Sequence, residues 1–442
     1  MAAWQFPAEF ALWVGALAAV LDARLQGRLA PLLLGLLFAQ GRSTVAAWLR
    51  AAQLSARFRP YYYFLGSLGR KTEQVAGRLL RRVQEIVPLG DRILLGIDDS
   101  PTKRYGPCVE GAGIHHNPTP GPADQKFLYG HVWVTLAWLV RHPSWGTIGL
   151  PLLARLYIRA RDVLKLVPWY RWKFQTKLEQ AAELVEWAAR WLRYLGKSLW
   201  VAADGAYAKR PFLRRAKAAG VIVVSRLRKD AGLCSVPPPP RPGQRGAPRK
   251  YGKQRISLAK RAGQRRGWQT GTFLLYGERV QKTFKTFLAT YPPAGGLIRV
   301  VLLKERDGWV AFFCTHPDAT VAQILEAVAD RASLEQVFHD VKEVHGAGEQ
   351  QLRNVWANIA AWHMTLWLHT LVELWAWGRS QAELTDRRAS PWDDPTRRPS
   401  HADRCKALRR ACLGAAFSRV LPAGPIARKI RRLFEALTQL AA

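Results

Sequence analysis

Three acidic side chains occupy positions from which carboxylates could act together. Asp99 follows the continuous apolar run 93–97, and Asp204 follows a second such run, 199–203. Glu335 lies in a segment with strong helical periodicity. Carboxylate oxygens are the ligands that Mg²⁺ and Mn²⁺ prefer. Two such ions about 4 Å apart can activate an attacking oxygen and stabilise a leaving oxygen in phosphodiester chemistry.

Each of these carboxylates has a more ordinary interpretation when it is taken alone. An Asp after a strand is usually a turn residue or a helix cap, and a Glu on an amphipathic helix is usually solvated. Asp330, Glu343 and Glu349 compete with Glu335 for the same role. A joint site is favoured by the combination of two strand-end Asp residues, a later helical Glu and a strongly basic chain.

Rigid elements must hold these carboxylates, and the apolar patterns predict such elements. Short continuous apolar runs predict buried strands, whose ends are where open α/β sheets bind ligands. Further strand-like runs cover 129–140, 221–225, 272–276, 283–290, 298–303 and 309–314. Helical periodicity predicts helices over 175–195, 210–219, 321–344 and 352–377, besides those before residue 88.

The helix predicted over 321–344 presents Arg331, Glu335, Phe338 and Lys342 on one face. We expect Phe338 to anchor that face in the core, with Glu335 and Lys342 flanking it. The spacing Arg331-x3-Glu335-x6-Lys342 resembles the signature of bacterial insertion-sequence DDE transposases of the cut-and-paste type, Tyr-x2-Arg-x3-Glu-x6-Lys. Val328 stands at the Tyr position, so this part of the signature is incomplete.

The two Asp motifs also resemble that family. The stretch 97–100 resembles the first-Asp motif, and the stretch 203–207 resembles the second. The family motif usually has an acidic or polar residue before the metal ligand and Thr or Ser after it, so the resemblance favours Asp99. Asp98 is the alternative, because strand alternation points adjacent side chains to opposite faces and either could be the ligand.

The resemblance implies an α/β fold with an RNase H-like (retroviral-integrase-like) core, interrupted by a β-rich insertion and flanked by helical regions. It implies that Asp99, Asp204 and Glu335 are catalytic and bind two divalent metal ions, Mg²⁺ or Mn²⁺. It also implies that Arg331 and Lys342 contact phosphates near the transposon end. The implied function is DNA recombination by transposition: cleavage at the ends of an insertion sequence, then strand transfer into target DNA. The implied partners are double-stranded DNA and a second copy of the chain in a homodimeric synaptic complex.

Five regions are expected along the chain. They are a helical N-terminal region over 1–88, the first part of the catalytic core over 89–225, a basic β-rich insertion over 226–318, the last part of the core with the catalytic-Glu helix over 319–377, and a polar linker with a basic helical tail over 378–442. The N-terminal region could bind DNA ends or form a plain helical cap.

The charge of the chain points to a polyanionic partner. Lys and Arg number 67 against 32 Asp and Glu, which gives a formal net charge of +35. Nucleic acid is the default candidate, with a host bias toward Arg as the alternative. Arg226, Arg228 and Lys229 follow a core strand, and we expect them to bind DNA phosphates together with the basic stretch 241–266. A solvated loop is the usual meaning of such a charge run.

Cysteine usage and the apolar runs bound the compartment. The five cysteines include no CxxC pair, which fits a reducing cytoplasm and argues against a disulfide framework or a zinc knuckle. We interpret Cys108, His115 and His116 as a loop rather than a metal site. The apolar runs 10–21 and 29–38 are too short to span a bilayer. We therefore expect a cytoplasmic protein without a membrane partner, and the resemblance to bacterial insertion-sequence transposases implies that it is nucleoid-associated.

Two functions of other classes stay open at this point. One is an RNase H-like structure-specific DNA nuclease that does not transfer strands. The other is a domesticated, non-catalytic DNA-binding protein that keeps the basic surface and needs no metal. A pre-cut end with a free 3′-hydroxyl separates the first alternative, since only a transposase joins that end to target DNA.

Overall fold

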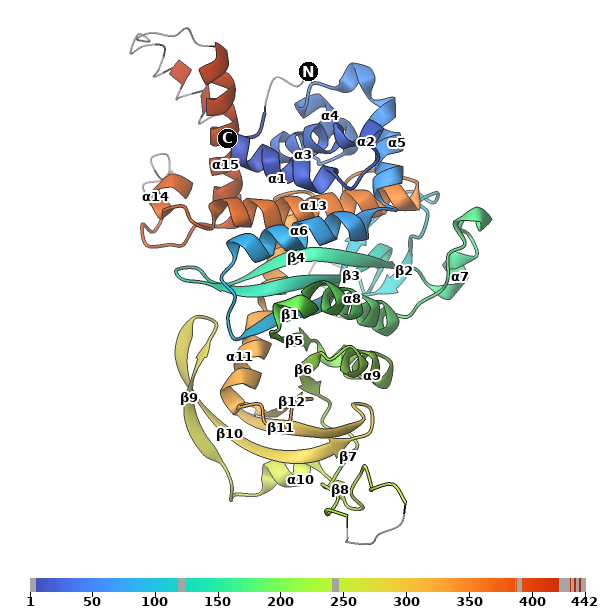
Figure 1. The fold of residues 1–442 in the computed structure, drawn as a ribbon, viewed down its shortest axis with the longest axis vertical. Coiled ribbons are helices and arrows are strands. Elements are labelled where there is room, and N and C mark those ends of the chain that lie inside the picture. Colours follow the sequence, from blue (N-terminus) through green and yellow to red (C-terminus); the bar gives the residue numbers. More distant parts are fainter. Residues whose placement is uncertain are drawn as a thin grey trace.

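One mixed sheet of 12 strands runs through the chain (Figure 1). The computed structural model describes residues 5–117, 125–240, 246–385, 387, 392–420, 430, 433–434 and 437–438. The strands are β1 (Arg92–Lys103), β2 (Gly113–His116), β3 (Phe127–His142), β4 (Gly146–Tyr157), β5 (Ser198–Ala203), β6 (Ile222–Leu227), β7 (Leu233–Cys234), β8 (Arg255–Ile256), β9 (Gln269–Leu275), β10 (Glu278–Tyr291), β11 (Gly296–Glu305) and β12 (Gly308–Cys314).

Helices flank the sheet and form one end of the molecule. They are α1 (Ala8–Ala18), α2 (Ala23–Gln26), α3 (Leu29–Phe38), α4 (Val45–Ala51), α5 (Arg59–Leu68), α6 (Thr72–Ile86), α7 (Ala160–Val163), α8 (Lys177–Leu192), α9 (Arg210–Ala218), α10 (Leu258–Gly263), α11 (Val321–Arg331), α12 (Ser333–Glu343), α13 (Val355–Ala376), α14 (Gln381–Leu384) and α15 (His401–Val420). Short 3₁₀ turns are η1 (Ser55–Arg57), η2 (Pro168–Tyr170), η3 (Arg193–Leu195) and η4 (Gly205–Tyr207).

The first five long strands stand in the order β4-β3-β1-β5-β6. β1, β5 and β6 are parallel to one another, whereas β3 is antiparallel to both β1 and β4. β12 pairs antiparallel with β6, and β11 and β10 follow it. The strands between residues 269 and 314 therefore continue the same sheet.

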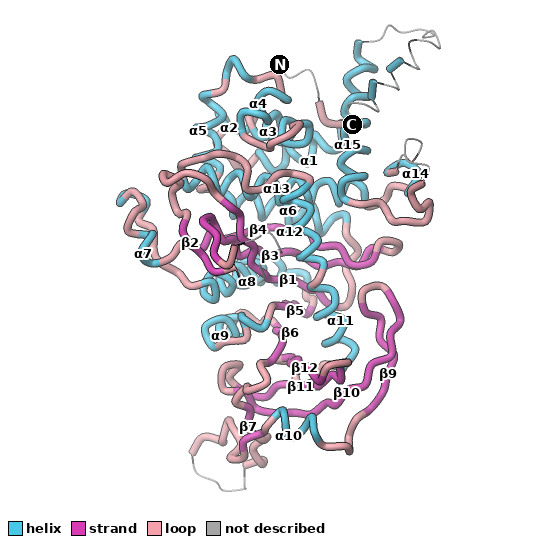
Figure 2. The backbone as a smooth tube through the Cα atoms, turned by 180° about the vertical axis from the view of Figure 1, so that it is seen from behind, coloured by secondary structure: helices cyan, strands magenta, loops and turns pink. Residues whose placement is uncertain are grey.

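Helices cover both faces of this sheet. α8 contacts β3, β4 and β5, and α9 contacts β6. α11 and α12 pack against the opposite face. α11 contacts β5 and β6 there, and α12 contacts β1 and β4. Figure 1 shows α8 and α9 in front of the strands, and Figure 2, seen from behind, shows α11 and α12 in front of them. The buried side chains accordingly divide into two clusters, one on each face.

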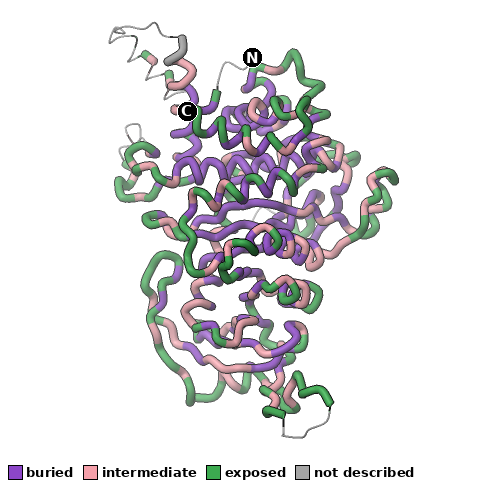
Figure 3. Tube along the Cα trace, viewed as in Figure 1, coloured by how far each residue is buried: buried purple, intermediate pink, exposed green. Residues whose placement is uncertain are grey.

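α13 is the most deeply buried helix of the helical end (Figure 3). It contacts α5, α6, α15 and β4. Trp362, Trp367 and Trp375 are all less than 5% exposed, so these tryptophans pack in the core. The two apolar runs near the N-terminus form α1 and α3, whose side chains join the same core. Among the described residues, no helix is both long and apolar enough to cross a membrane.

Several local predictions are confirmed and others are wrong. The strands expected at 93–97, 199–203 and 221–225 are present, but β1 continues to Lys103, so that Asp98 and Asp99 lie inside the strand and not after it. The Thr44 hydroxyl caps α4 by accepting the Ala47 N–H at 3.1 Å. His115 and His116 lie in β2, not in a loop. β4 was not expected. Among the described strands it pairs with β3 alone, and it contains Pro151 beside a register shift, which interrupts the pattern of a regular strand.

The single helix predicted over 321–344 is wrong, because α11 ends at Arg331 and α12 begins at Ser333. The Ser333 hydroxyl donates to the Asp330 carbonyl at 2.7 Å, and the Glu335 N–H bonds the Ala332 carbonyl, three residues back. A serine hydroxyl that bonds the preceding turn competes with the regular helical hydrogen bonds. Arg331 therefore stands in the last turn of one helix and Glu335 in the first turn of the next.

Candidate active site

The side chains of β1 alternate between the two faces of the sheet, and this alternation separates Asp98 from Asp99. Leu95 and Ile97 pack in the cluster on the α8 face. Leu94 packs in the cluster on the opposite face, together with side chains of α12. A Cβ on Gly96 would lie 2.8 Å from the Leu334 side chain of α12. By this alternation Asp98 lies on the α12 face and Asp99 on the α8 face.

Hydrogen bonds agree with that placement of Asp98. Its Oδ2 accepts from Nη1 of Arg331 at 2.5 Å, and its Oδ1 accepts from the Asp99 N–H at 2.8 Å. The other guanidinium nitrogen of Arg331, Nη2, lies 3.7 Å from Oε1 of Glu335. The Arg331 guanidinium thus lies between the carboxylates of Asp98 and Glu335. The Glu335 side chain is 69% exposed, so it is free to reorient.

Asp204 comes to the same face through the register of two parallel strands. Ile97 of β1 pairs with Ala203 of β5, so Asp98 and Asp204 are the next residues on neighbouring strands. Oδ2 of Asp204 accepts the Ala206 N–H at 3.0 Å at the start of η4. The Ser225 hydroxyl donates to the Asp204 carbonyl at 3.1 Å and fixes the strand end.

The acidic groups influence one another electrostatically. Burial, opposed by Arg331 and aided by the nearby charges of Asp99 and Asp204, raises the pKa of Asp98 to about 6. A carboxyl that is costly to ionise beside other carboxylates is typical of a site built for cations.

Asp99 is held on the other face by two donors. Lys177 Nζ lies 2.6 Å from its Oδ2, and the Tyr207 hydroxyl donates to its Oδ1 at 2.9 Å. Burial and the neighbouring carboxylates keep the pKa of Tyr207 well above its ordinary value, so the phenol retains its proton. The sequence did not indicate Lys177, and Tyr207 was noted only as part of the second-Asp stretch.

Of the three competing acids, Asp330 and Glu349 have other partners and Glu343 is exposed. Asp330 accepts from the Thr147 hydroxyl at 2.6 Å and forms an ion pair with Arg141 at 3.1 Å. Glu349 accepts the Ser43 N–H at 2.7 Å. Glu343 is exposed at the end of α12.

Basic residues line two open hollows in the molecule. Lys342 lines a cavity of about 860 Å³ together with Arg42, Lys103 and Tyr105. Arg226 lines another hollow of about 420 Å³ with Arg228, Lys229 and Gly205, directly after Asp204. Part of the basic stretch expected to bind phosphates, residues 241–245, lies outside the described residues.

The donor set on the α12 face fits divalent metal ions. Asp98, Asp204 and Glu335 offer only hard carboxylate oxygens, which suit Mg²⁺ or Mn²⁺. In this structure the positive charge between Asp98 and Glu335 comes from Arg331. The group that this arrangement can handle is a phosphodiester, since cations flanked by carboxylates stabilise both the attacking and the leaving oxygen.

Comparison with known protein families agrees with this chemistry. Residues 16–272 match the family described as DDE superfamily endonuclease, and the chain belongs to that superfamily. Residues 176–371 match the family described as transposase DDE domain. The first match includes Asp98, Asp99 and Asp204, and the second includes Asp204 and Glu335. The prediction of a DDE transposase is therefore confirmed. A comparison with curated proteins found no match.

Proposed function

We propose that this protein cuts DNA at the ends of a mobile element and joins those ends to target DNA, with two divalent ions held by Asp98, Asp204 and Glu335. The observation that carries the proposal is the shared face: strand alternation and register bring Asp98 and Asp204 to the side of the sheet that α12 covers. The order β4-β3-β1-β5-β6, with β1, β5 and β6 parallel, supports an RNase H-like core.

The proposed ligand set replaces Asp99 by its neighbour Asp98. Asp99 becomes a positioning residue, which ties the middle of β1 to Lys177 of α8 and Tyr207 of η4. When bound, Mg²⁺ or Mn²⁺ would activate the attacking oxygen and stabilise the leaving oxygen. Arg331 would compensate the carboxylate charge in the free protein and turn toward a DNA phosphate when cations arrive.

Double-stranded DNA would follow the basic hollows beside the acidic site. Lys342 lines one hollow with Arg42 and Lys103, and Arg226 lines another with Gly205, the residue after Asp204. Arginine and lysine bind phosphate through charge-assisted hydrogen bonds and displace condensed counterions. Joining two ends of one element needs two active sites, so the working form would be a homodimer in a synaptic complex.

Substituting Glu335→Gln tests the function directly. Loss of one metal-binding carboxylate should remove several kcal/mol of transition-state stabilisation, so cleavage should fall by about a thousandfold or more. DNA binding in a gel-shift titration should change little. Glu343→Gln is the matched control, because Glu343 is an exposed acid at the end of the same helix. Retained cleavage by Glu335→Gln in a folded protein would contradict the proposal.

A second measurement separates transposition from simple nuclease activity. A labelled DNA end that already carries a free 3′-hydroxyl is incubated with the protein, Mg²⁺ and supercoiled target DNA. A transposase joins the label to the target, whereas a nuclease leaves it free. Absence of joined product under conditions where intact ends are cut would refute strand transfer.

A further inference from the structure

A second group of metal-ligating side chains lies away from the acidic site, where the ends of three elements meet. His345 is in the turn after α12, and His401 and Cys405 stand one turn apart on α15. All three side chains are buried, with exposures of 2%, 3% and 1% respectively. Glu373 reaches the same place from α13 and is 1% exposed.

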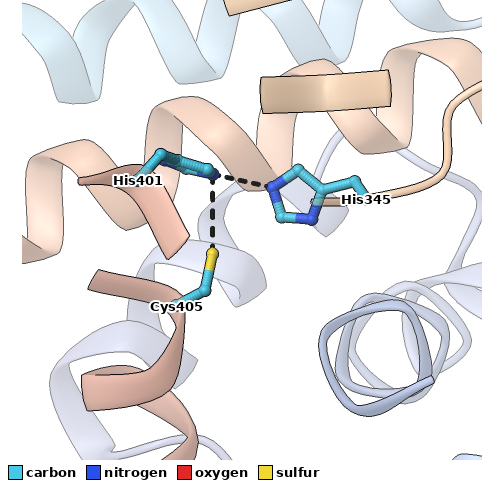
Figure 4. Close-up of side chains that lie close together, drawn as sticks. All are labelled: His345, His401 and Cys405. Atoms are coloured by element: carbon cyan, nitrogen blue, oxygen red, sulfur yellow. Dashed lines mark hydrogen bonds between the residues drawn. The ribbon is translucent and has the colours of Figure 1, made fainter. Parts of the chain in front are cut away.

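The ligand atoms of this group converge on one point. Nε2 of His401 lies 2.8 Å from Nε2 of His345 and 3.5 Å from Sγ of Cys405. Figure 4 shows His345 and Cys405 both directed at the same nitrogen edge of His401. The three ligand atoms all lie within 4.8 Å of one another.

We propose that His345, His401 and Cys405 bind a divalent transition-metal ion of the zinc type, separate from the catalytic ions. A tetrahedral zinc ion with bonds of about 2.0–2.1 Å to nitrogen and 2.3 Å to sulfur holds two nitrogens about 3.3 Å apart, and a nitrogen and a sulfur about 3.6 Å apart. The His401–Cys405 distance already matches, and the two imidazoles need to separate by only about half an ångström.

The surroundings of His401 are those of a metal-binding imidazole. Its Nδ1 lies 2.6 Å from Oε1 of Glu373, and a carboxylate in that position orients the ring so that Nε2 faces the ion. Arg404 holds Glu373 in turn, with bonds of 2.8 and 2.6 Å to its two oxygens. These bonds hold the pKa of Glu373 below its ordinary range despite its burial, so the carboxylate is ionised.

Two further side chains offer a fourth ligand. The His369 ring stacks on that of His401 with centroids 4.1 Å apart, and its buried Nδ1 has no hydrogen-bond partner among the described residues. Asp340, His369 and His401 form a second group whose ligand atoms lie within 4.8 Å of one another. These three residues also line an open cavity of about 450 Å³, through which an ion could reach the cluster.

The proton balance of metal binding is simple. Because the Glu373 carboxylate only accepts, His401 donates Nδ1–H to it and accepts from Nε2–H of His345 at its own Nε2. Burial lowers the pKa of both imidazoles, which keeps them neutral, and raises that of the Cys405 thiol to about 12. On binding, His345 shifts its proton from Nε2 to Nδ1, and Cys405 releases one proton as its thiolate bonds the cation.

The ligand chemistry separates this centre from the catalytic one. Two imidazoles and a thiolate select zinc, cobalt or copper over magnesium, whereas the three carboxylates select magnesium or manganese. A metal at His345 would tie the C-terminal end of α12 to α15. It would therefore act as a structural clamp on the helix that begins beside Glu335.

The test uses the full chain, purified without chelator, incubated with Zn²⁺ and then desalted. Elemental analysis should find about one zinc per chain. Replacing zinc by Co²⁺ should give the intense thiolate-to-cobalt charge-transfer band and the visible bands of a tetrahedral site. Cys405→Ser should lose the charge-transfer band and bind zinc at least about tenfold more weakly, while Cys412→Ser, a buried cysteine on the same helix, should match the wild type.

Two controls keep the outcome clear. Asp98→Asn should retain the zinc and the cobalt band, since the proposed catalytic ligands include no thiol. If Cys405→Ser does not fold, the wild-type cobalt spectrum and the zinc-dependent rise in its melting temperature decide. Folded wild-type protein that keeps no zinc after desalting, or a cobalt band that survives unchanged in Cys405→Ser, would overturn the proposal.

Discussion

The choice between the adjacent acids on β1 gives the sharpest test of the site. Asp98→Asn removes a proposed metal ligand from the face shared with Asp204 and Glu335, and it removes the closer of the two anionic partners of the partly buried Arg331. Loss of one carboxylate from a metal site costs several kcal/mol in the transition state, which is about a thousandfold or more in cleavage rate.

Asp99→Asn should have a much smaller effect. The Lys177–Asp99 ion pair is exposed, with side chains that are 38% and 25% accessible, so it contributes about 0.2–1 kcal/mol. The amide oxygen of Asn can still accept the Tyr207 hydroxyl. We therefore expect a loss of about 1 kcal/mol, which corresponds to at most about a tenfold slower cleavage. The two isosteric variants should thus differ by about a hundredfold or more.

The assay is single-turnover cleavage of DNA that carries the ends of the element flanking the gene, with Mg²⁺. Binding of Mn²⁺ to each variant, followed by electron paramagnetic resonance, reports on ligand loss without DNA. The reasoning is refuted if folded Asp99→Asn is inactive while Asp98→Asn cleaves and binds Mn²⁺ normally. That result would restore Asp99 as the ligand that the sequence motif favours.

Three further predictions concern pH and packing. The pKa of Asp98 is raised to about 6, and its carboxylate is the form that would bind metal. Cleavage at limiting Mg²⁺ should therefore slow as the pH drops through about 6, and a higher Mg²⁺ concentration should lower the pH of the midpoint. A cleavage rate that stays constant down to about pH 5 would contradict this prediction. Burial lowers the pKa of His363 to about 4, which is below its value in the unfolded chain. Between these two pKa values the unfolded chain binds more protons, so the free energy of unfolding decreases as the pH falls. In urea titrations, His363→Gln should make the decrease in unfolding free energy between about pH 7.5 and 5 smaller by about 2 kcal/mol. A Cβ on Gly69 would lie within 2 Å of the Trp356 carbonyl, whereas one on Gly66 would meet only the Asn354 side chain at 3.9 Å. Gly69→Ala should therefore destabilise the protein by about 1–3 kcal/mol, whereas Gly66→Ala, inside α5, should stabilise it by up to about 1 kcal/mol. Equal melting temperatures of the two variants would be the opposing result.

Local pattern was enough to predict much of the frame. The runs 93–97 and 199–203 form β1 and β5 because continuous apolar residues suit strands that are covered on both faces. Asp204 accordingly lies at the carboxyl end of β5, whereas Asp98 and Asp99 lie inside β1, which continues to Lys103. The cap of α4 by Thr44 is equally local, because that interaction needs only residues three positions apart.

Tertiary placement was beyond such patterns. Whether Asp98 or Asp99 faces Glu335 depends on which side of the sheet α12 packs, and nothing within 97–100 encodes that side. The break between α11 and α12 likewise depends on the Ser333 hydroxyl donating to the Asp330 carbonyl and not to solvent. His345 and Cys405 come from separate helical regions without metal-binding spacing, so only folding brings them within reach of one ion.

The position of Glu335 depends on how both ends of α12 are packed. Leu334 packs beneath Gly96 of β1 and Val337 beneath Gly149 of β4, where an added Cβ would lie 2.8 Å from each side chain. The glycines therefore let α12 approach the sheet closely enough for Glu335 to share Arg331 with Asp98. At the other end of α12, His345 joins the buried group on α13 and α15. A small change in the tilt of α12 would move Glu335 relative to the strands of the sheet, which would stay in place. Loosening the His345 end of α12 should therefore slow cleavage, but by less than the loss of a carboxylate does. The pH midpoint that Asp98 sets should not change.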